Sequence, residues 1–222
     1  MHKDIERNIP KENIEYTYLS IISKKLNVGI VGGGKASYIK AKSFLNKGCT
    51  VEVLSLDFIE EFYDLNNVTL INESYNKRFI KNKHLVIIAT NNNEKNLEIK
   101  KDCDDEFKLY IFASDFSEGT AITPVQKELE NISFAINTKN GNPKGSLMIA
   151  NKVMNLLEGY DDFIGYSSYV REQAKSLKEN KKEIIDFVCS EDFYYIYTKG
   201  KEKIVLEMFF GIKLINEIYK NH

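Results

Sequence analysis

The stretch IVGGGKASYIKA, residues 30–41, places three consecutive glycines between an apolar run and a helix-like segment. Within it, residues 32–37 fit the pattern G-x-G-x-x-small, which joins a strand to a helix in dinucleotide-binding folds. Gly32 permits the tight turn, Gly34 lets a pyrophosphate approach the backbone, and Ser37 is small enough for helix and strand to pack closely. The free N–H groups at the helix N-terminus favour phosphate. A glycine corner without a ligand is the alternative interpretation.

Short apolar runs alternate with polar helical segments on both sides of this turn. The predicted strands are residues 27–31, 49–56, 68–72, 83–90 and 108–114, and the predicted helices are 36–46 and 93–103. The first helix takes its apolar face from Ala36, Ile39, Phe44 and Leu45, and Gly48 suits its C-terminal cap. This alternation predicts an α/β fold with a Rossmann-type parallel sheet that is covered on both faces.

The pattern changes after Asp115. Residues 121–125 and 132–137 predict an antiparallel pair of strands, and from Gly145 the signal is helical to the end of the chain. We therefore expect a Rossmann domain over residues 1–115, a small β segment over 116–144 and a C-terminal helical domain over 145–222.

Composition limits the kinds of partner that the chain suits. Its 222 residues carry 31 Lys and Arg against 32 Asp and Glu, so charge gives no case for nucleic-acid or membrane-surface binding. Cys49, Cys103 and Cys189 form no CxxC pair, which predicts reduced packing thiols in a cytoplasmic protein. The polar N-terminus predicts no signal peptide, and no apolar run approaches the ~20 residues of a membrane span. The three histidines, His2, His84 and His222, form no cluster with the cysteines, so no metal site is predicted.

Cofactor choice in a Rossmann domain depends on the end of the second strand, where an acid usually binds the ribose. Here Leu56 ends the strand and Asp57 follows slightly late. Asp57 either binds the ribose from the loop or is solvated, and both interpretations stay open. The absence of Arg or Lys beside it in the sequence favours NAD over NADP.

Several segments, taken in order, resemble the precorrin-2 dehydrogenase family, which includes the N-terminal part of siroheme synthase. They are GGGKASYIKA with Lys40-Ala41 in register, CTVEVLSLDFIEEF, LVIIATNNNEKN with Asn96, FASD, AITPV and FAINTKNGNP. The resemblance covers roughly residues 15–158. The sequence departs from the family at Phe112, where the family has Asn, and at Lys139-Asn140, where it has Gly-Gly.

The resemblance implies NAD-dependent oxidation of precorrin-2 to sirohydrochlorin, a step toward siroheme or cobalamin. It also implies a homodimer in which the segment after Asp115 pairs between subunits. Lys35-Ala36 and Leu56-Asp57 match stretches that contact NAD, and Thr90 and Asn91 match positions beside the cofactor. Thr138 matches a hydroxyl residue near the substrate pocket.

Asp115 matches the aspartate regarded as catalytic in that family. Oxidation by hydride loss leaves a proton to remove, and a carboxylate can serve as the general base. A turn or helix cap is the other interpretation, because Asp is common in such loops. Lys139, with Lys144 and Lys152, is a candidate to bind the carboxylates of the substrate, or is a solvated surface lysine.

Two further functions are compatible with this sequence. Some family members also insert iron into the product, so a bifunctional dehydrogenase and sirohydrochlorin ferrochelatase is one alternative. A non-catalytic NAD-binding regulatory module is the other. Asp115 after the fifth strand favours an enzyme over the regulatory module.

Overall fold

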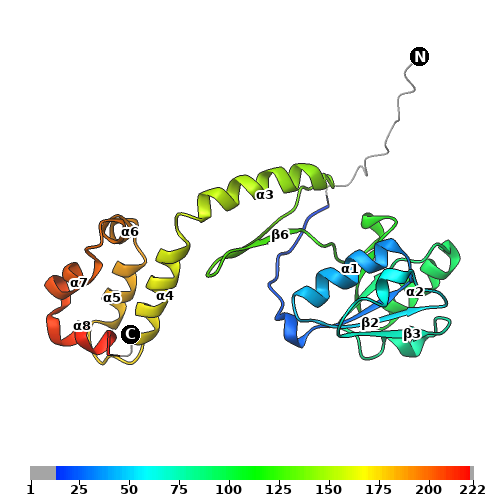
Figure 1. Ribbon diagram of the computed structural model, residues 1–222, viewed down its shortest axis with the longest axis horizontal. Helices are drawn as coiled ribbons and strands as arrows, with labels where there is room; N and C mark the ends of the chain where they lie inside the picture. Colours follow the sequence, from blue (N-terminus) through cyan, green and yellow to red (C-terminus); the bar gives the residue numbers. More distant parts are fainter. Residues whose placement is uncertain (1–13, 221–222) are drawn as a thin grey trace, which may run out of the picture. The chain divides into compact units, whose positions relative to one another are not determined.

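The computed structural model describes residues 14–220, so the polar N-terminal stretch to residue 13, His2 and His222 lie outside the described residues. The chain divides into two compact units, Met1–Thr123 and Pro124–His222 (Figure 1).

The first unit is built on a five-stranded parallel sheet in the order β3-β2-β1-β4-β5. Its strands are β1 (Asn27–Val31), β2 (Thr50–Ser55), β3 (Val68–Asn72), β4 (Leu85–Ile88) and β5 (Leu109–Phe112). The chain moves outward from β1 through β2 to β3, and then returns to place β4 on the other side of β1. The strand order therefore reverses beside β1, which is the switch point where parallel sheets bind ligands. The predicted Rossmann-type sheet is confirmed.

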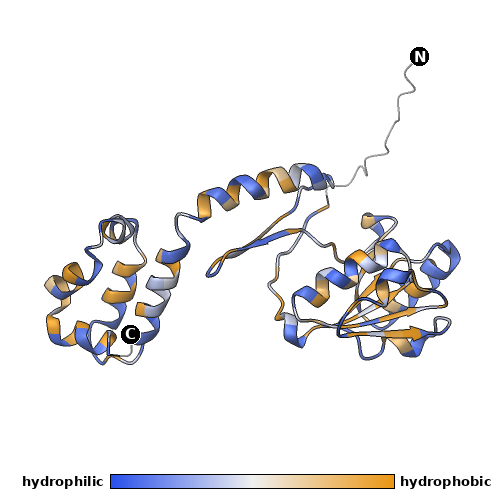
Figure 2. Cartoon of the chain, viewed as in Figure 1, coloured by the Kyte–Doolittle hydropathy of each residue, from blue (hydrophilic) through white to orange (hydrophobic). Residues whose placement is uncertain are grey.

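Helices cover both faces of this sheet. α1 (Lys35–Asn46) follows β1, and α2 (Asn93–Asp105) follows β4. The side chains of Val28, Ile30 and Ala41 belong to one buried cluster, on the face that α1 covers. Ile99 and Phe112 belong to the cluster that α2 covers. Figure 2 shows the strands between these layers as largely hydrophobic. Phe112 is thus a core residue, buried in the same cluster as Ile99 of α2.

The predicted apolar face of α1 is partly wrong. Ser37 and Ala41 are its buried residues, whereas Ile39 is 56% exposed and Ala36 is exposed. The small residues lie against the sheet because they allow the helix to approach it closely. Gly48 closes the helix as expected, with a φ of +79°.

Short 3-10 turns complete the first unit: η1 (Ser23–Lys25), η2 (Glu60–Phe62), η3 (Lys77–Ile80) and η4 (Phe116–Glu118). After η4 the chain runs back along β5, where the Ala121 amide donates to the Tyr110 carbonyl at 3.0 Å. The ammonium of Lys40 on α1 donates to the Thr123 hydroxyl at 2.8 Å. The predicted strand over residues 121–125 is therefore misplaced, because residues 121–123 close the first unit and only Val125 lies in a strand.

The second unit begins with an antiparallel hairpin, β6 (Val125–Glu128) and β7 (Ser133–Ile136), so the predicted antiparallel pair is confirmed. β7 lies within the predicted range 132–137, whereas β6 begins where the predicted range 121–125 ends. α3 (Pro143–Leu157) packs on this hairpin, with Pro143 in its first turn. The helices that follow are α4 (Asp161–Ala174), α5 (Lys181–Val188), α6 (Glu191–Thr198), α7 (Glu202–Phe210) and α8 (Ile212–Ile218). The carboxylate of Asp161 accepts hydrogen bonds from the amides of Glu130 and Asn131, which ties the hairpin tip to α4.

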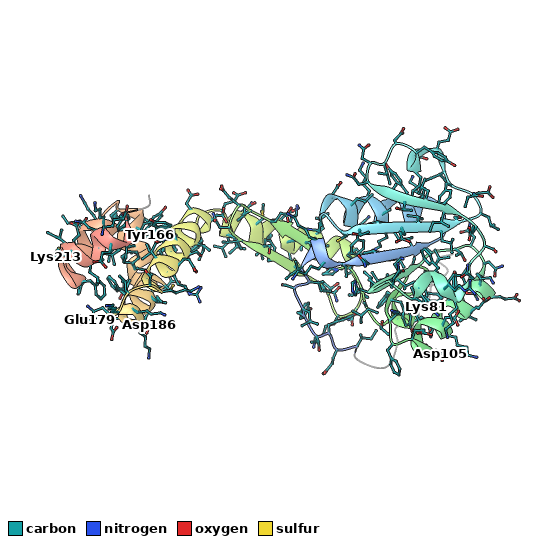
Figure 3. All side chains as sticks on the ribbon, turned by 90° about the horizontal axis from the view of Figure 1, so that it is seen from below. Lys81, Asp105, Tyr166, Glu179, Asp186 and Lys213 are labelled. Atoms are coloured by element: carbon teal, nitrogen blue, oxygen red, sulfur yellow. The ribbon has the colours of Figure 1, made fainter. Side chains whose placement is uncertain are left out.

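The helices α4–α8 enclose a core of their own, to which Phe163, Ile184 and Leu206 contribute. Tyr166, labelled in Figure 3, shares a short hydroxyl–hydroxyl hydrogen bond with Tyr219 and packs against this core. The tyrosines of the α4 segment are therefore packing residues.

The cysteines differ from one another in exposure. Cys49 and Cys103 are buried, in agreement with their expected packing role, and burial raises the pKa of the Cys103 thiol to about 12. Cys189 is exposed, so the expectation that it packs in the interior is wrong. It follows the last residue of α5, at the C-terminal cap position of the helix.

Candidate functional site

The glycine turn is held against two neighbouring strands. The Gly32 amide donates to the Leu54 carbonyl of β2 at 2.9 Å, and Gly32 has a φ of +123°, which L side chains rarely adopt. A Cβ at this position would lie 2.3 Å from the Ala89 carbonyl oxygen, just beyond β4. Only glycine therefore fits at the start of the turn.

Gly33 contacts the loop that follows β2. A Cβ on Gly33 would lie 1.8 Å from the carbonyl oxygen of Asp57, and the Ile59 amide donates to the Gly33 carbonyl at 3.0 Å. These contacts fix the loop of Leu56 and Asp57 beside the turn. The sequence pattern leaves the middle position free, so it missed this requirement; the glycine at that middle position was the available signal.

Gly34 faces open space. Among the residues that the structure describes, and apart from Gly34 and its chain neighbours Gly33 and Lys35, no atom lies within 4 Å of the position that a Cβ on Gly34 would take. Gly34 is also the N-cap of α1, so no side chain caps the first turn, and that turn contains no acidic residue. Lys35 and Ala36 are exposed. Free amides beside an unfilled cradle are what a phosphate group requires, so these residues fit a dinucleotide.

Ser37 joins α1 to the sheet. It is fully buried, and its hydroxyl approaches the Ala89 carbonyl at 3.5 Å. The prediction that this position must be small is confirmed, because the side chain lies between the helix and the end of β4.

The turn after β4 is organised by a buried asparagine. The Thr90 hydroxyl donates to Oδ1 of Asn96 at 2.6 Å, and Nδ2 of Asn96 donates to the Thr90 carbonyl at 3.0 Å. Asn92 caps α2 by accepting from the Lys95 amide, and Asn91 is exposed. The sequence motif includes Asn96, but it does not predict that the Asn96 side chain is buried and holds Thr90 in place.

The loop after β2 is held from the next strand. Nδ2 of Asn72, at the end of β3, donates to the Leu56 carbonyl at 2.6 Å. Asp57 is exposed, and its backbone lies against Gly33. The acid is therefore placed at the edge of the glycine turn, where its carboxylate is accessible.

Asp115 follows β5 and caps η4. Its Oδ1 accepts from the Ser117 amide at 2.9 Å and from the Ser117 hydroxyl at 2.6 Å. These two hydrogen bonds, with a smaller contribution from Lys100, hold the pKa of the Asp115 carboxyl below its usual value. Lys100 of α2 also forms an ion pair with Glu118. Asp115 is exposed, so the cap leaves the carboxylate accessible at the sheet edge.

Gly32–Ser37, Thr90 and Asp115 follow β1, β4 and β5, which are neighbours in one parallel sheet. The carboxyl ends of parallel strands meet at one edge, so the first unit brings the predicted cofactor residues and Asp115 to the same edge.

The predicted substrate residues belong to the second unit. The Thr138 hydroxyl accepts from the Asn142 amide at 2.7 Å, and the Asn142 side chain caps α3 through the Gly145 amide. Thr138 thereby shapes the turn that precedes α3. Lys139 and Lys144 are exposed.

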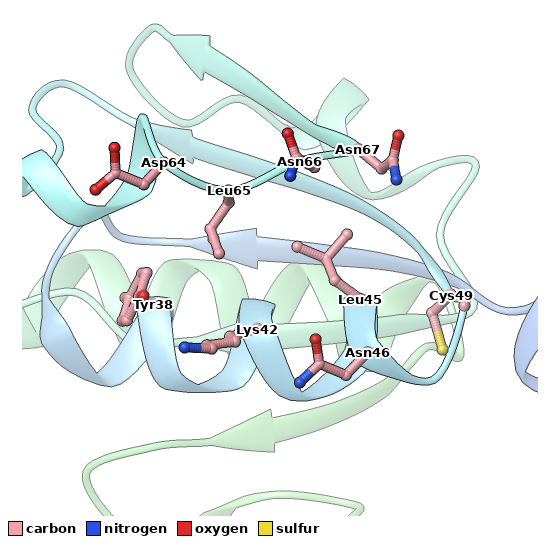
Figure 4. A pocket seen from close by; sticks show the side chains of 10 residues that line it. Tyr38, Lys42, Leu45, Asn46, Cys49, Asp64, Leu65, Asn66 and Asn67 are labelled. Carbon is pink, nitrogen blue, oxygen red and sulfur yellow. The ribbon is translucent and has the colours of Figure 1, made fainter.

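A hollow of about 530 Å³ lies elsewhere on the first unit (Figure 4). Its lining includes Lys42 and Asn46 of α1 and Asn67 before β3, and it contains none of the predicted site residues. The hollow is therefore separate from the candidate site at the sheet edge.

Within residues 14–220, no three His, Cys, Asp or Glu side chains gather as metal ligands would. His84 uses Nδ1 to accept the Asn27 amide at 3.0 Å, which joins the start of β4 to β1. Over the same residues, the structure contains no helix with the length and apolar character of a membrane span.

Known proteins resemble the chain in both sequence and structure. The profile of a family described as "Putative NAD(P)-binding" matches residues 19–125. The solved structure titled "SirC, precorrin-2 dehydrogenase" shares the fold with a TM-score of 0.67 and 21% identity, over 88% of this chain and 100% of that one. A nicotinamide cofactor therefore suits the first unit.

Two sequence relatives carry the assignment further. "Precorrin-2 dehydrogenase" from Priestia megaterium is 23% identical over 189 residues, which span 81% of this chain and 92% of the relative. "Putative precorrin-2 dehydrogenase" from Methanocaldococcus jannaschii is 30% identical over 176 residues, which span 74% of this chain and 83% of the relative. The chain belongs to the precorrin-2 dehydrogenase family, a family of oxidoreductases.

Proposed function

We propose that this protein oxidises precorrin-2 to sirohydrochlorin with NAD, in the biosynthesis of siroheme or cobalamin. One observation carries the proposal. A glycine turn with an open face and an accessible carboxylate, Asp115, stand at one edge of the sheet in a chain of this family.

NAD is held in this proposal by the glycine turn and the two loops beside it. The amides of Lys35, Ala36 and Ser37 receive the pyrophosphate at the uncapped start of α1. Leu56 and Asp57 receive the adenine-side ribose. The loop of residues 55–59 contains no Arg or Lys to pair with a 2′-phosphate, which favours NAD over NADP.

Thr90 and Asn91 lie after β4, on the side where the nicotinamide of a Rossmann cofactor binds. The bound nicotinamide supplies the hydride acceptor. The oxidation removes two hydrogens from the macrocycle, one as hydride and one as a proton. Asp115 takes the proton as general base; an aspartate carboxyl is ionised at neutral pH, and the lowered pKa of Asp115 favours that form further.

Substrate binding is assigned to the second unit. Precorrin-2 carries many carboxylates, and the exposed ammonium of Lys139 is suited to pair with one of them. We assign Thr138 to the same site, where its hydroxyl bonds to Asn142 and so holds the turn that carries Lys139. We assign residues 1–115 to cofactor binding, 116–144 to dimerisation and 145–222 to the helical domain.

A homodimer is supported by an apolar surface on α3, which directly follows the proposed dimerisation segment. Leu147, Met148, Ile149 and Leu156 are between 41% and 65% exposed. A second copy would cover such a surface. We place the reaction in the cytoplasm, where the unpaired Cys49, Cys103 and Cys189 stay reduced.

Asp115→Asn tests the catalytic assignment. Asparagine keeps an oxygen that caps η4 but cannot take a proton, so the fold and NAD affinity should survive while kcat falls about 10²–10⁴-fold. Sirohydrochlorin absorbance after addition of precorrin-2 and NAD measures kcat, and titration with NAD measures affinity.

Near-normal turnover by Asp115→Asn would show that another group takes the proton. A wild-type protein that forms no sirohydrochlorin would overturn the whole proposal. Repeating the assay with Fe²⁺ tests for ferrochelatase activity, because siroheme would then form.

A further inference from the structure

Ser117 makes two hydrogen bonds to a single oxygen of Asp115. Its amide and its hydroxyl donate to Oδ1 at 2.9 Å and 2.6 Å. Within residues 14–220, the second carboxylate oxygen of Asp115, Oδ2, has no hydrogen-bond partner. The serine thus fixes one oxygen and leaves the other facing solvent at the carboxyl edge of β5.

The charged neighbours of this carboxylate are fixed as well. Lys100, on α2, is the cation that acts on Asp115, and it forms an ion pair with Glu118 of η4. Glu118 thereby holds the ammonium beside the loop and offsets its charge. The hydroxyl and the amide of Ser117 lower the pKa of the Asp115 carboxyl, and the charge of Lys100 lowers it as well.

We propose that Ser117 is a positioning residue for the dehydrogenase reaction, holding Oδ1 of Asp115 so that Oδ2 is presented to the proton that leaves the substrate. This inference rests on the proposed role of Asp115 as the base. Ser117 itself touches neither cofactor nor substrate in this proposal.

A physical consequence separates this role from a purely structural one. A hydroxyl that donates to a carboxylate stabilises its ionised form, so removing that hydroxyl raises the pKa of the carboxyl. The base would then be protonated at a higher pH. The acid limb of the pH profile of kcat/KM should move to higher pH, by about one pH unit.

The experiment compares three variants of the full chain. Ser117→Ala removes the hydroxyl but keeps the amide, and Ser117→Thr restores a hydroxyl. Ser114→Ala is the matched control, since it removes a neighbouring exposed serine hydroxyl that has no hydrogen bond within the described part of the chain. We expect the acid limb to move in Ser117→Ala, to return toward the wild-type position in Ser117→Thr and to stay in place in Ser114→Ala.

A second measurement does not depend on turnover. The carboxyl carbon of Asp115 can be titrated by NMR in the free protein, and its pKa should rise in Ser117→Ala and hold in Ser114→Ala. If the NMR titration and the acid limb are both unchanged in Ser117→Ala, the positioning role is wrong.

The two proposals fail in different ways. If Asp115→Asn is inactive and Ser117→Ala leaves both the acid limb and the NMR titration in place, Asp115 remains the base and only the role of Ser117 is overturned. If Asp115→Asn keeps its activity, the proposed base is wrong, whatever Ser117→Ala does to the carboxyl titration.

Discussion

The turn after β1 and the loop after β5 stand at the same edge of the sheet, yet their backbone amides are treated in opposite ways. α1 begins after Gly34, which has no side chain to cap the first turn. η4 begins after Asp115, whose carboxylate accepts the Ser117 amide. The amides in the first turn of α1 are free to bind a ligand. In the loop after β5, by contrast, the Ser117 amide is already hydrogen-bonded to the carboxylate of Asp115.

The difference indicates how each region is specified. In the glycine turn, most side chains would clash with neighbouring backbone, so substitutions there should act through steric effects. The β5 loop is defined by which group accepts a hydrogen bond, so substitutions there should act through charge and orientation. Four predictions, beginning with the glycines, test this contrast.

Gly33→Ala should have the largest effect. Its Cβ would lie 1.8 Å from the Asp57 carbonyl oxygen, and a backbone carbonyl cannot move aside as a flexible side chain can. We expect the free energy of unfolding to fall by about 3 kcal/mol or more, with a loss of NAD binding. Urea unfolding followed by circular dichroism measures the first quantity.

Gly34→Ala is the matched control for this prediction, since within the described residues its Cβ would meet no atom within 4 Å beyond its two chain neighbours. Its unfolding free energy should stay within about 0.5 kcal/mol of the wild type. Equal stability of Gly33→Ala and Gly34→Ala would contradict the claim that the two glycines serve different purposes.

Gly34→Val should separate binding from folding. Gly34 has a φ of −89° and a ψ of −175°, an extended backbone that valine adopts readily, so the fold should persist. The branched side chain would occupy the approach of the pyrophosphate. We expect NAD affinity to fall roughly 30-fold, which corresponds to about 2 kcal/mol. Calorimetric titration with NAD measures the affinity. An unchanged Kd would show that the glycine turn is not part of the cofactor site.

The contrast also explains how much of the fold was predictable from the sequence. β1 over residues 27–31 and β3 over 68–72 match their predicted ranges, because apolar runs between polar turns determine buried strands locally. The strand expected over residues 121–125 was misplaced because Ala121 pairs with Tyr110 and packs on the sheet of the first unit. That pairing depends on residues distant in the sequence, and an apolar run does not reveal its partner.

The same division applies to the candidate site. The requirement for glycine at position 32 and for a small residue at 37 follows from a backbone motif of known geometry. The roles of Gly33, Asn96 and Ser117 depend on which loop or side chain each one meets. Sequence patterns predict where a backbone must bend or approach closely, and they do not predict which oxygen a side chain will hold.

Asn96 offers an intermediate case, because a buried side chain holds the turn after β4. Asn96→Ala would remove both the acceptor of the Thr90 hydroxyl and the donor to the Thr90 carbonyl. We expect a loss of about 1–3 kcal/mol in the free energy of unfolding, measured in urea. Asn91→Ala, at an exposed position of the same turn, is the control and should change stability little. Equal stability of the two variants would show that the Thr90–Asn96 pair contributes nothing to the turn.

The smallest effect concerns Lys40, which links the glycine-turn helix to the segment that follows the β5 loop. Its ammonium donates to the Thr123 hydroxyl at 2.8 Å, and burial lowers the pKa of the amine. Burial therefore penalises the charged form in the folded state, and the penalty disappears as pH rises through the folded pKa toward the unfolded one. Lys40→Met keeps the apolar stem but loses both the hydrogen bond and the charge, so at pH 7 we expect a net change within about 1 kcal/mol.

The sign of the pH dependence is the sharper test of Lys40. Between pH 7 and pH 10 the wild type should gain stability relative to Lys40→Met, because deprotonation relieves a cost that only the wild type carries. Urea unfolding of both proteins at the two pH values measures this difference. A double-mutant cycle with Thr123→Val should give a coupling of about 0.5–1 kcal/mol at pH 7. Two results together would contradict this role of Lys40: a stability difference between wild type and Lys40→Met that does not vary with pH, and zero coupling to Thr123. The glycine turn and the β5 loop would then each be positioned by their own strand.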